Sequence, residues 1–238
     1  MNLYMSFLNK KIINFDPKII GLDLSDLSVK VFQIEKAGKQ DIVRGFGSAD
    51  IPAGAIEDGR IVDKEKVIAA IGGLFKLPSA KKIDSKKVIC SLPESKAFVR
   101  IINIPKMDET EAEEAVKWEM EANMPMLLEE VYFDWQFLEG GDEKMQRVLT
   151  AAVSREIVDS WTDVLSSANL DVYGLEVESI STIRSLVGKD AKREDISLIV
   201  DLGAKRTSFI IAEGVVPYFT SSIPFSSEGI NDAIMKSL

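Results

Sequence analysis

The sequence predicts an α/β fold that contains an inserted α+β module. Short apolar runs rich in β-branched residues come first, and one amphipathic helical pattern follows them. A second set of strand and helix patterns then precedes further apolar runs near the end of the chain. The 238 residues are enough for more than one folded unit. We therefore expect a sheet-and-helix domain whose chain order is interrupted by a second module.

The first part of the chain reads as three strands and a helix. The strands are expected at residues 19–24, 28–36 and 41–51, because each is an apolar run bounded by turn residues. The helix is expected at residues 63–77, where apolar side chains recur at helical spacing. These apolar residues are Val67, Ile68, Ile71, Leu74 and Phe75. A helix of this kind buries one face against a sheet.

A strand pair and a capped helix open the inserted module. The strands are expected at residues 87–93 and 97–105. Asp108 stands where a helix N-cap is needed, and Glu111 follows three residues later, which is the capping-box pattern. The helix should run to about Asn123, because a proline follows shortly afterwards.

Alternating strands and helices complete the chain before the last apolar runs. A hairpin is expected from residues 129–139 and 145–154, joined by a glycine-containing turn. A helix follows at 155–168, then a strand at 170–178 and a second helix at 178–188.

Composition limits the classes of function. Hydrophobic residues are 46% and charged residues 28% of the chain, as in folded rather than disordered proteins. The net charge of −9, without a long basic run, argues against a nucleic-acid surface. The absence of histidine excludes Ser-His-Asp and Cys-His catalysis and His-ligated metal sites. The single cysteine, Cys90, lies in an apolar run, which predicts a buried thiol in a cytoplasmic protein.

The first 18 residues are expected to form an N-terminal leader. Leu3, Phe7 and Leu8 could share a helix face above Lys10 and Lys11, which would allow weak contact with a membrane surface. We expect a frayed leader instead. No apolar run in the sequence approaches the roughly 20 residues that span a bilayer.

Two strand–turn–strand segments, nearly the whole chain apart, place an acid at the same point. Asp23 ends the first apolar run in "IIGLDLSDLSVKVFQI", and Asp201 does so in "LIVDLGAKRTSFII". Aspartate and glycine between strands are typical of an ordinary hairpin turn. They are equally typical of a phosphate site, where backbone N–H groups face oxygen atoms and the acid addresses a metal ion. On the residues alone, both interpretations stay open.

This pair of segments resembles the phosphate-binding hairpins of the actin-like ATPase superfamily, which includes actin, Hsp70, sugar kinases and FtsA. The first hairpin of that superfamily carries an aspartate with a lysine seven residues later, as Asp23 and Lys30 stand here. The second carries an aspartate, a glycine two residues later and a threonine six residues later, which Asp201, Gly203 and Thr207 match. The resemblance implies an actin-like (ribonuclease H-like) α/β fold that binds ATP with Mg²⁺.

The resemblance also implies roles for residues around the hairpins. Glu178 begins the helix before the second hairpin, where the superfamily places a polar residue that orients the attacking water. Ser25, Asp26 and Ser28 belong to the first turn and are expected among the nucleotide contacts. The family usually has glycine where Ser25 stands, and the charge of Asp26 would weaken phosphate binding unless its side chain turns outward.

The expected metal ligands are the two paired aspartates. Asp23 and Asp201 would hold Mg²⁺ largely through water, because this ion keeps its octahedral shell. Lys30 would add a point charge beside the phosphates. We expect nucleotide binding rather than turnover, with a weak ATPase activity left open. The alternative is a non-hydrolysing adaptor that keeps the fold but has degenerate phosphate loops.

The inserted module narrows the resemblance. The segment "PKMDETEAEEAVKWEMEANMPMLLEEVYFDWQFLE" closely resembles the PilM family, the cytoplasmic actin-like proteins of type IV pilus assembly. This resemblance covers nearly all of residues 19–238. It implies a place at the inner face of the cytoplasmic membrane, with self-association also expected. It further implies a partner, the N-terminal tail of a PilN-like inner-membrane protein, held in a groove between the inserted subdomain and the first sheet. Trp118 and Trp135 are candidates for that groove. The alternatives are relatives of type II secretion (GspL-like) or cell division (FtsA-like).

The actin-like fold also predicts domain limits. A frayed leader is expected at residues 1–18 and the first part of subdomain 1A at 19–85. A 1C-like insert follows at 86–168, and the chain then returns to 1A with the connecting helix at 169–193. Residues 194–238 are expected to begin subdomain 2A, which is incomplete. Few residues follow Thr207, whereas the superfamily places an adenine-side loop and a further subdomain there. The sequence therefore looks C-terminally truncated.

Overall fold

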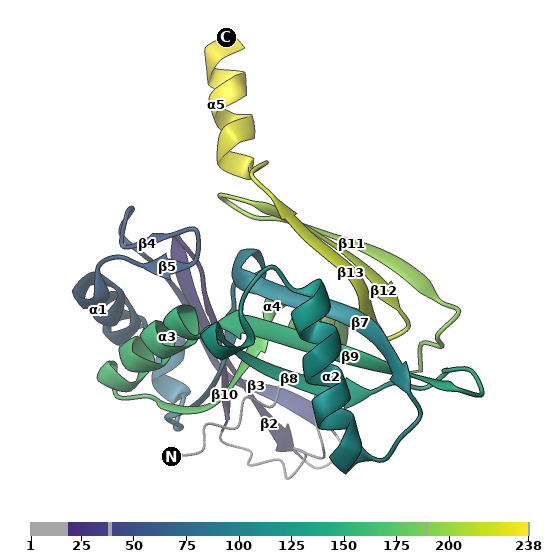
Figure 1. Ribbon diagram of the computed structural model, residues 1–238. Helices are drawn as coiled ribbons and strands as arrows, with labels where there is room; N and C mark the ends of the chain where they lie inside the picture. The colour runs from purple at the N-terminus through teal and green to yellow at the C-terminus, as the bar shows by residue number, and fades with distance from the viewer. Residues whose placement is uncertain (1–18, 38–39, 189, 238) are drawn as a thin grey trace. The chain divides into compact units, whose positions relative to one another are not determined.

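The structure is a computed structural model, and it describes residues 19–37, 40–188 and 190–237. The predicted leader, residues 1–18, lies outside the described residues. The chain divides into two compact units. The first comprises Met1–Pro93 and Arg155–Glu176, and the second comprises Glu94–Ser154 and Val177–Leu238. Each unit is described by itself below, with the element labels of Figure 1.

The first unit is built on a five-stranded sheet in the order β10-β6-β1-β2-β3. Strands β1 and β2 are antiparallel, as are β2 and β3, whereas β1 and β6 are parallel. The five strands are β1 (Ile20–Leu24), β2 (Ser28–Ala37), β3 (Gln40–Asp50), β6 (Lys87–Leu92) and β10 (Asp171–Val177). Side chains alternate between buried and exposed along β1 and β2, so one face of this part of the sheet is buried.

Two helices accompany this sheet. Helix α1 (Lys64–Leu74) packs on β2 and β3 and also on α3 (Arg155–Ser167). The carboxylate of Asp63 caps α1 by accepting the N–H of Lys66 at 3.1 Å. Val67, a residue of the predicted apolar stripe, is fully buried. The helical periodicity therefore identified the packing face correctly, and the short 3₁₀ turn Ala80–Lys82 follows the helix.

A small hairpin in the first unit was not expected from the sequence. It consists of β4 (Ile56–Glu57) and β5 (Arg60–Ile61), joined by Asp58 and Gly59. Both turn residues have positive φ, at 49° and 76°. The segment "IEDGRI" contains the Asp-Gly pair that favours two-residue hairpins, so a signal for it was present.

The second unit contains two antiparallel sheets of three strands each. The first has the order β7-β9-β8, formed by β7 (Ala97–Pro105), β9 (Met145–Ser154) and β8 (Val131–Phe137). Short 3₁₀ turns, η2 (Glu94–Lys96) and η3 (Leu128–Glu130), precede β7 and β8. These strands confirm the predicted strand at 97–105 and the predicted hairpin.

Helix α2 (Glu109–Asn123) packs on this sheet. The predicted N-cap is observed, because Oδ1 of Asp108 accepts the N–H groups of Thr110 and Glu111, both at 3.0 Å. Three residues spaced four apart are fully buried on the sheet side. These are Ala112, Val116 and Met120. Local capping and periodicity therefore determine this helix.

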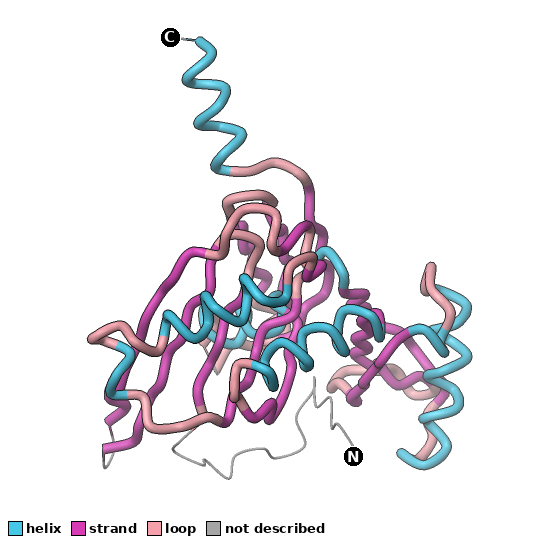
Figure 2. Tube along the Cα trace, turned by 90° about the vertical axis from the view of Figure 1, so that its left-hand side faces the viewer, coloured by secondary structure: helices cyan, strands magenta, loops and turns pink. Residues whose placement is uncertain are grey.

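The other sheet of the second unit has the order β11-β12-β13. Its strands are β11 (Ile196–Leu202), β12 (Thr207–Glu213) and β13 (Val216–Ile223). Helix α4 (Glu178–Leu186) packs on β13, whereas α5 (Ser227–Ser237) extends beyond the end of β13 and buries none of its described residues (Figures 1 and 2). Four apolar residues of β11 are about half exposed or more, namely Ile196, Leu198, Val200 and Leu202, whereas Ile199 is half-buried and packs against Ile183, Ile210 and Ala212.

The buried thiol predicted for Cys90 is confirmed, since this residue on β6 is fully buried. Within the described ranges, no helix is long and apolar enough to cross a membrane. The predicted insert of residues 86–168 includes all of the β7-β9-β8 sheet, but β6 pairs with β1 in the five-stranded sheet. The assignment of actin-like subdomains stays a prediction.

Candidate functional site

The first hairpin places Asp23 and Lys30 directly opposite each other on β1 and β2. Residues that pair across antiparallel strands point to the same face, so the two side chains meet. Nζ of Lys30 lies 2.9 Å from Oδ2 of Asp23. The hydroxyl of Ser91, on β6, donates to Oδ1 of Asp23 at 3.0 Å. Both carboxylate oxygens are thus engaged, although 44% of the Asp23 side chain stays exposed.

The turn of this hairpin is closed by its own serines. The backbone N–H of Ser25 donates to the carbonyl of Ser28 at 2.9 Å. The Ser25 hydroxyl donates to the same carbonyl at 3.1 Å and lies 3.1 Å from the Ser28 hydroxyl. The two serines therefore use these polar groups to hold the turn, which explains how serine replaces the glycine usual in related hairpins.

The side chain of Asp26 turns toward the β4–β5 hairpin. Its Oδ2 accepts the N–H of Asp58 and its Oδ1 accepts the N–H of Gly59, both at 3.0 Å. Successive N–H groups on residues with positive φ form a concave anion site, and the Asp26 carboxylate fills it. The indole N–H of Trp161 donates to the carbonyl of Gly59 at 3.0 Å, so the hairpin is held from both sides. The negatively charged carboxylate of Asp26 therefore stabilises the β4–β5 hairpin.

The second hairpin joins β11 and β12 through the turn of Gly203–Arg206. The N–H of Gly203 donates to the carbonyl of Arg206 at 2.9 Å. A Cβ atom at position 203 would lie 2.8 Å from that carbonyl oxygen, so the close approach requires glycine. The carbonyl of Gly203 accepts from the N–H and the hydroxyl of Ser227, which ties the turn to the start of α5. The geometry of this turn is therefore sufficient to explain why residue 203 is glycine.

The other two residues of the predicted second site differ in exposure. Thr207 is 2% exposed, and its hydroxyl donates to the carbonyl of Phe225 at 2.6 Å. This bond ties the start of β12 to the segment after β13. Asp201, at the end of β11, is exposed, and its carboxylate makes no hydrogen bond or ion pair with the described part of the chain. Of the three residues predicted for this site, Asp201 therefore presents a charged side chain to solvent.

Glu178 is the first residue of α4 and forms a reciprocal pair with Glu94. Oε2 of Glu178 accepts the N–H of Glu94 at 3.2 Å, and Oε2 of Glu94 accepts the N–H of Ser179 at 3.3 Å. Glu94 is only 6% exposed. A carboxylate at the first turn of a helix satisfies N–H groups that have no partner within the helix. Glu94 was not singled out from the sequence, because its partner lies 84 residues away.

The structure thus groups the predicted site residues by hairpin. The first unit brings Lys30 and Ser91 to Asp23. In the second unit, the β11–β12 hairpin carries Asp201, and α4, which packs on β13, begins with Glu178. Each hairpin therefore offers an exposed or half-exposed carboxylate at the end of a strand.

Comparison with known proteins places the chain in a family. Residues 21–237 match the family described as type IV pilus assembly protein PilM. The structure is similar to a chain of the solved PilM-PilN type IV pilus biogenesis complex, with a TM-score of 0.80 and 25% identity. The similarity covers 93% of this chain and 66% of that chain, so this chain spans just under two thirds of its length.

Two other solved structures share the fold. One is the cytoplasmic domain of EpsL, an inner-membrane component of the type II secretion system of Vibrio cholerae, with a TM-score of 0.54 and 13% identity over 87% of this chain and 71% of that one. The other is the ethanolamine utilization protein EutJ from Carboxydothermus hydrogenoformans, with a TM-score of 0.51 and 15% identity over 92% and 56%. The predicted actin-like α/β fold class is confirmed, and with a match that extends over residues 21–237 the chain belongs to the PilM family of type IV pilus assembly proteins.

Proposed function

We propose that this protein acts in type IV pilus assembly by binding the N-terminal cytoplasmic tail of a PilN-like inner-membrane protein. The observation that carries this proposal is the similarity to the PilM-PilN complex, with a TM-score of 0.80 over 93% of this chain. In this proposal the protein lies in the cytoplasm at the inner face of the membrane, and the tail of its partner links it to the bilayer.

An exposed tryptophan supports a binding surface on α2. Trp118 is 75% exposed, although a large indole is normally buried in a folded protein. Tryptophan is enriched among the residues that contribute most to protein interfaces. The other candidate, Trp135, is half-buried and packs edge-on against Phe137, with ring centroids 5.2 Å apart. We therefore assign the tail contact to Trp118 and a packing role to Trp135.

A fluorescence titration tests this proposal. The chain is titrated with a synthetic peptide that has the sequence of the N-terminal tail of the PilN-like protein from the same organism. We expect saturable binding of roughly micromolar affinity, with a change in tryptophan emission that is lost in Trp118→Phe. Trp135→Phe is the matched control and should keep the change. Unchanged emission from a folded chain at saturating peptide would contradict the proposal.

We further infer that the full-length protein binds ATP with Mg²⁺ through the two hairpins. The residues fit such a group in kind, because each hairpin places a carboxylate with solvent access at a strand end, and Lys30 supplies a cation at the first. In the described ranges, no three Cys, Asp or Glu side chains gather as a metal cage. We assign to Asp23 and to Asp201 the role of a carboxylate that contacts the water shell of the ion, and the ion would supply charge neutralisation for the phosphates.

The other residues that the sequence predicted for the nucleotide site are assigned roles according to their hydrogen bonds. Ser25, Asp26 and Ser28 hold the shape of the first turn and its neighbouring hairpin. Thr207 fixes the start of β12 from within the fold. Glu178 is a carboxylate with several lone pairs, so it accepts the N–H of Glu94 and could accept a bond from a water molecule as well. Binding is the proposed activity, and turnover forms no part of it.

Calorimetry on the full-length protein tests the nucleotide proposal. Asp201→Ala should abolish detectable Mg-ATP binding, because it removes the exposed carboxylate of the second hairpin. Asp232→Ala is the matched control, since it removes the same charge from an exposed position on α5. Equal Mg-ATP affinity in the two variants would overturn the assignment of Asp201.

A further inference from the structure

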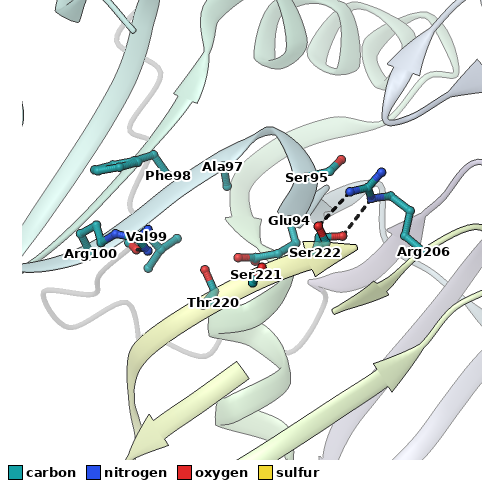
Figure 3. Close-up of a pocket in the computed structure, with 10 residues that line it drawn as sticks. All are labelled: Glu94, Ser95, Ala97, Phe98, Val99, Arg100, Arg206, Thr220, Ser221 and Ser222. Atoms are coloured by element: carbon teal, nitrogen blue, oxygen red, sulfur yellow. Dashed lines mark hydrogen bonds between the residues drawn. The ribbon is translucent and has the colours of Figure 1, made fainter. Parts of the chain in front are cut away.

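A polar pocket of about 190 Å³ lies within the second unit. It lies between β13 and the start of β7, and the turn before β12 contributes Arg206. Figure 3 shows Arg100 at one end of the lining and Arg206 at the other, with Glu94 and the hydroxyl residues of β13 between them. Those hydroxyl residues are Thr220, Ser221 and Ser222, and Ser95 adds another hydroxyl beside Arg206.

The guanidinium group of Arg206 is held in a fixed plane. Its Nε donates to the hydroxyl of Ser222 and its Nη2 donates to the Ser222 carbonyl, both at 2.9 Å (Figure 3). Planar guanidinium groups bind oxyanions through parallel N–H groups, and a group that is already oriented loses little freedom on binding. Arg206 is therefore suited to hold an anion in the pocket.

A second guanidinium group is fixed at the opposite end. The guanidinium carbon of Arg100 lies 5.3 Å from the ring centroid of Phe98 and 5.7 Å from that of Phe219. Both distances fall within the range of cation–π contacts. Its Nη1 also donates to the carbonyl of Val99 at 3.1 Å. The pocket is thus bounded by two oriented cations.

A buried carboxylate lies between these cations. Glu94 lines the pocket, is 6% exposed and accepts the N–H of Ser179 through Oε2. A carboxylate repels an oxyanion that has no proton, yet it accepts a hydrogen bond from an oxyanion that carries one. Inorganic phosphate keeps at least one proton at neutral pH, whereas sulfate keeps none.

We propose that this pocket binds hydrogen phosphate and selects it against sulfate. Arg206 and Arg100 supply the positive charge, and the hydroxyls of Ser95 and Ser221 supply neutral hydrogen bonds. The carboxylate of Glu94 accepts a hydrogen bond from the hydroxyl group that the phosphate keeps, and this bond provides the selectivity.

The position of the pocket links it to both elements of the second half of the proposed nucleotide site. Arg206 belongs to the turn that Gly203 closes, and Glu94 is bonded to the first turn of α4, which Glu178 begins. Phosphate in the pocket would contact Arg206 of this turn and Glu94, which is bonded to α4. The phosphate pocket does not depend on ATP binding, so the two proposals fail independently.

Nuclear magnetic resonance on the ¹⁵N-labelled chain tests the pocket. Potassium phosphate and potassium sulfate are added in parallel at constant ionic strength. We expect saturable shifts of the amides of Ser95, Ser221 and Ser222 with phosphate, and sulfate affinity at least about tenfold weaker. Shifts confined to residues 21–30 would place phosphate at the first hairpin, and equal affinity for sulfate would remove the role of Glu94. Either result would overturn the proposal.

Variants separate the pocket from general surface charge. Arg206→Gln should weaken phosphate binding at least about tenfold, because it removes a charged hydrogen-bonding group. Lys205→Gln is the matched control: it removes the same charge from the same turn, but Lys205 is half exposed, pairs with Glu228 and does not line the pocket. Equal loss of affinity in both variants would contradict the proposal. Glu94→Gln should raise sulfate affinity toward that of phosphate, and if it does not fold, Ser221→Ala should still weaken phosphate several-fold.

Discussion

The contact of Asp26 with the β4–β5 hairpin leads to the most detailed prediction. In Asp26→Ala, the N–H groups of Asp58 and Gly59 lose their acceptor. Hydrogen bonds to a charged group contribute roughly 1.5–3 kcal/mol each, and screening by solvent favours the low end. For two bonds at the low end of this range, we therefore expect the free energy of unfolding to fall by about 3 kcal/mol. Asp26→Asn keeps one acceptor oxygen and should lose about half of that amount.

Urea denaturation followed by tryptophan fluorescence measures this change. Trp161 is fully buried in the first unit and donates to Gly59, so its emission reports on this hairpin. Trp118 and Trp135 are replaced by phenylalanine in the background to isolate it. Asp41→Ala, at an exposed position of β3, is the matched control and should change stability by no more than about 0.5 kcal/mol.

The orientation of the Asp26 carboxylate also affects nucleotide binding. If its carboxylate faced bound phosphates instead, removal of the charge would raise Mg-ATP affinity in the full-length protein and leave stability unchanged. A loss of less than about 0.5 kcal/mol in Asp26→Ala, together with tighter Mg-ATP binding, would therefore refute the structural role assigned here.

Two further predictions concern hydrogen bonds from threonine hydroxyls. Thr207→Val removes a buried bond to Phe225 and leaves that carbonyl without this donor, so we expect a loss of about 1–2 kcal/mol, whereas Thr207→Ser should retain most of the stability; urea midpoints of both variants decide. The Thr110 hydroxyl, followed by the N–H of Glu111, lowers the pKa of Asp108 below its ordinary value. A carboxyl group whose pKa is lowered on folding stabilises the protein at pH values above its ordinary pKa, and this stability is lost as the pH falls through the pKa of the folded state. In Asp108→Asn, the free energy of unfolding should therefore fall less steeply as the pH is lowered.

The elements that the sequence predicts best are those with local signals. Helix α2 begins at a capping residue and buries a stripe with helical spacing, so its limits and its face both follow from nearby residues. Strand β11 shows a limit of this reasoning. Its apolar run identified a strand, yet Leu198 and Val200 are more than half exposed, because the residues that bury a strand face come from tertiary neighbours.

In the candidate site, too, contacts within one hairpin could be predicted from the sequence, whereas contacts between distant segments could not. The pairing of Asp23 with Lys30 follows from a spacing of seven residues across one hairpin, so sequence reasoning could find it. The hydrogen-bond partners of Asp26 lie 32 and 33 residues away along the chain, and no local sequence pattern predicts them. Gly203 is not evidence for a phosphate site, because the geometry of the turn alone requires glycine at this position.

Isothermal calorimetry of the unmodified chain with the PilN-like tail peptide is the direct test of tail binding. A peptide of the same composition in scrambled order is the control for charge and apolar content. We expect saturable heat with an affinity of roughly micromolar for the native order and none for the scrambled peptide. The absence of heat with both peptides, from a chain whose circular dichroism shows it to be folded, would contradict the proposed binding of the PilN-like tail.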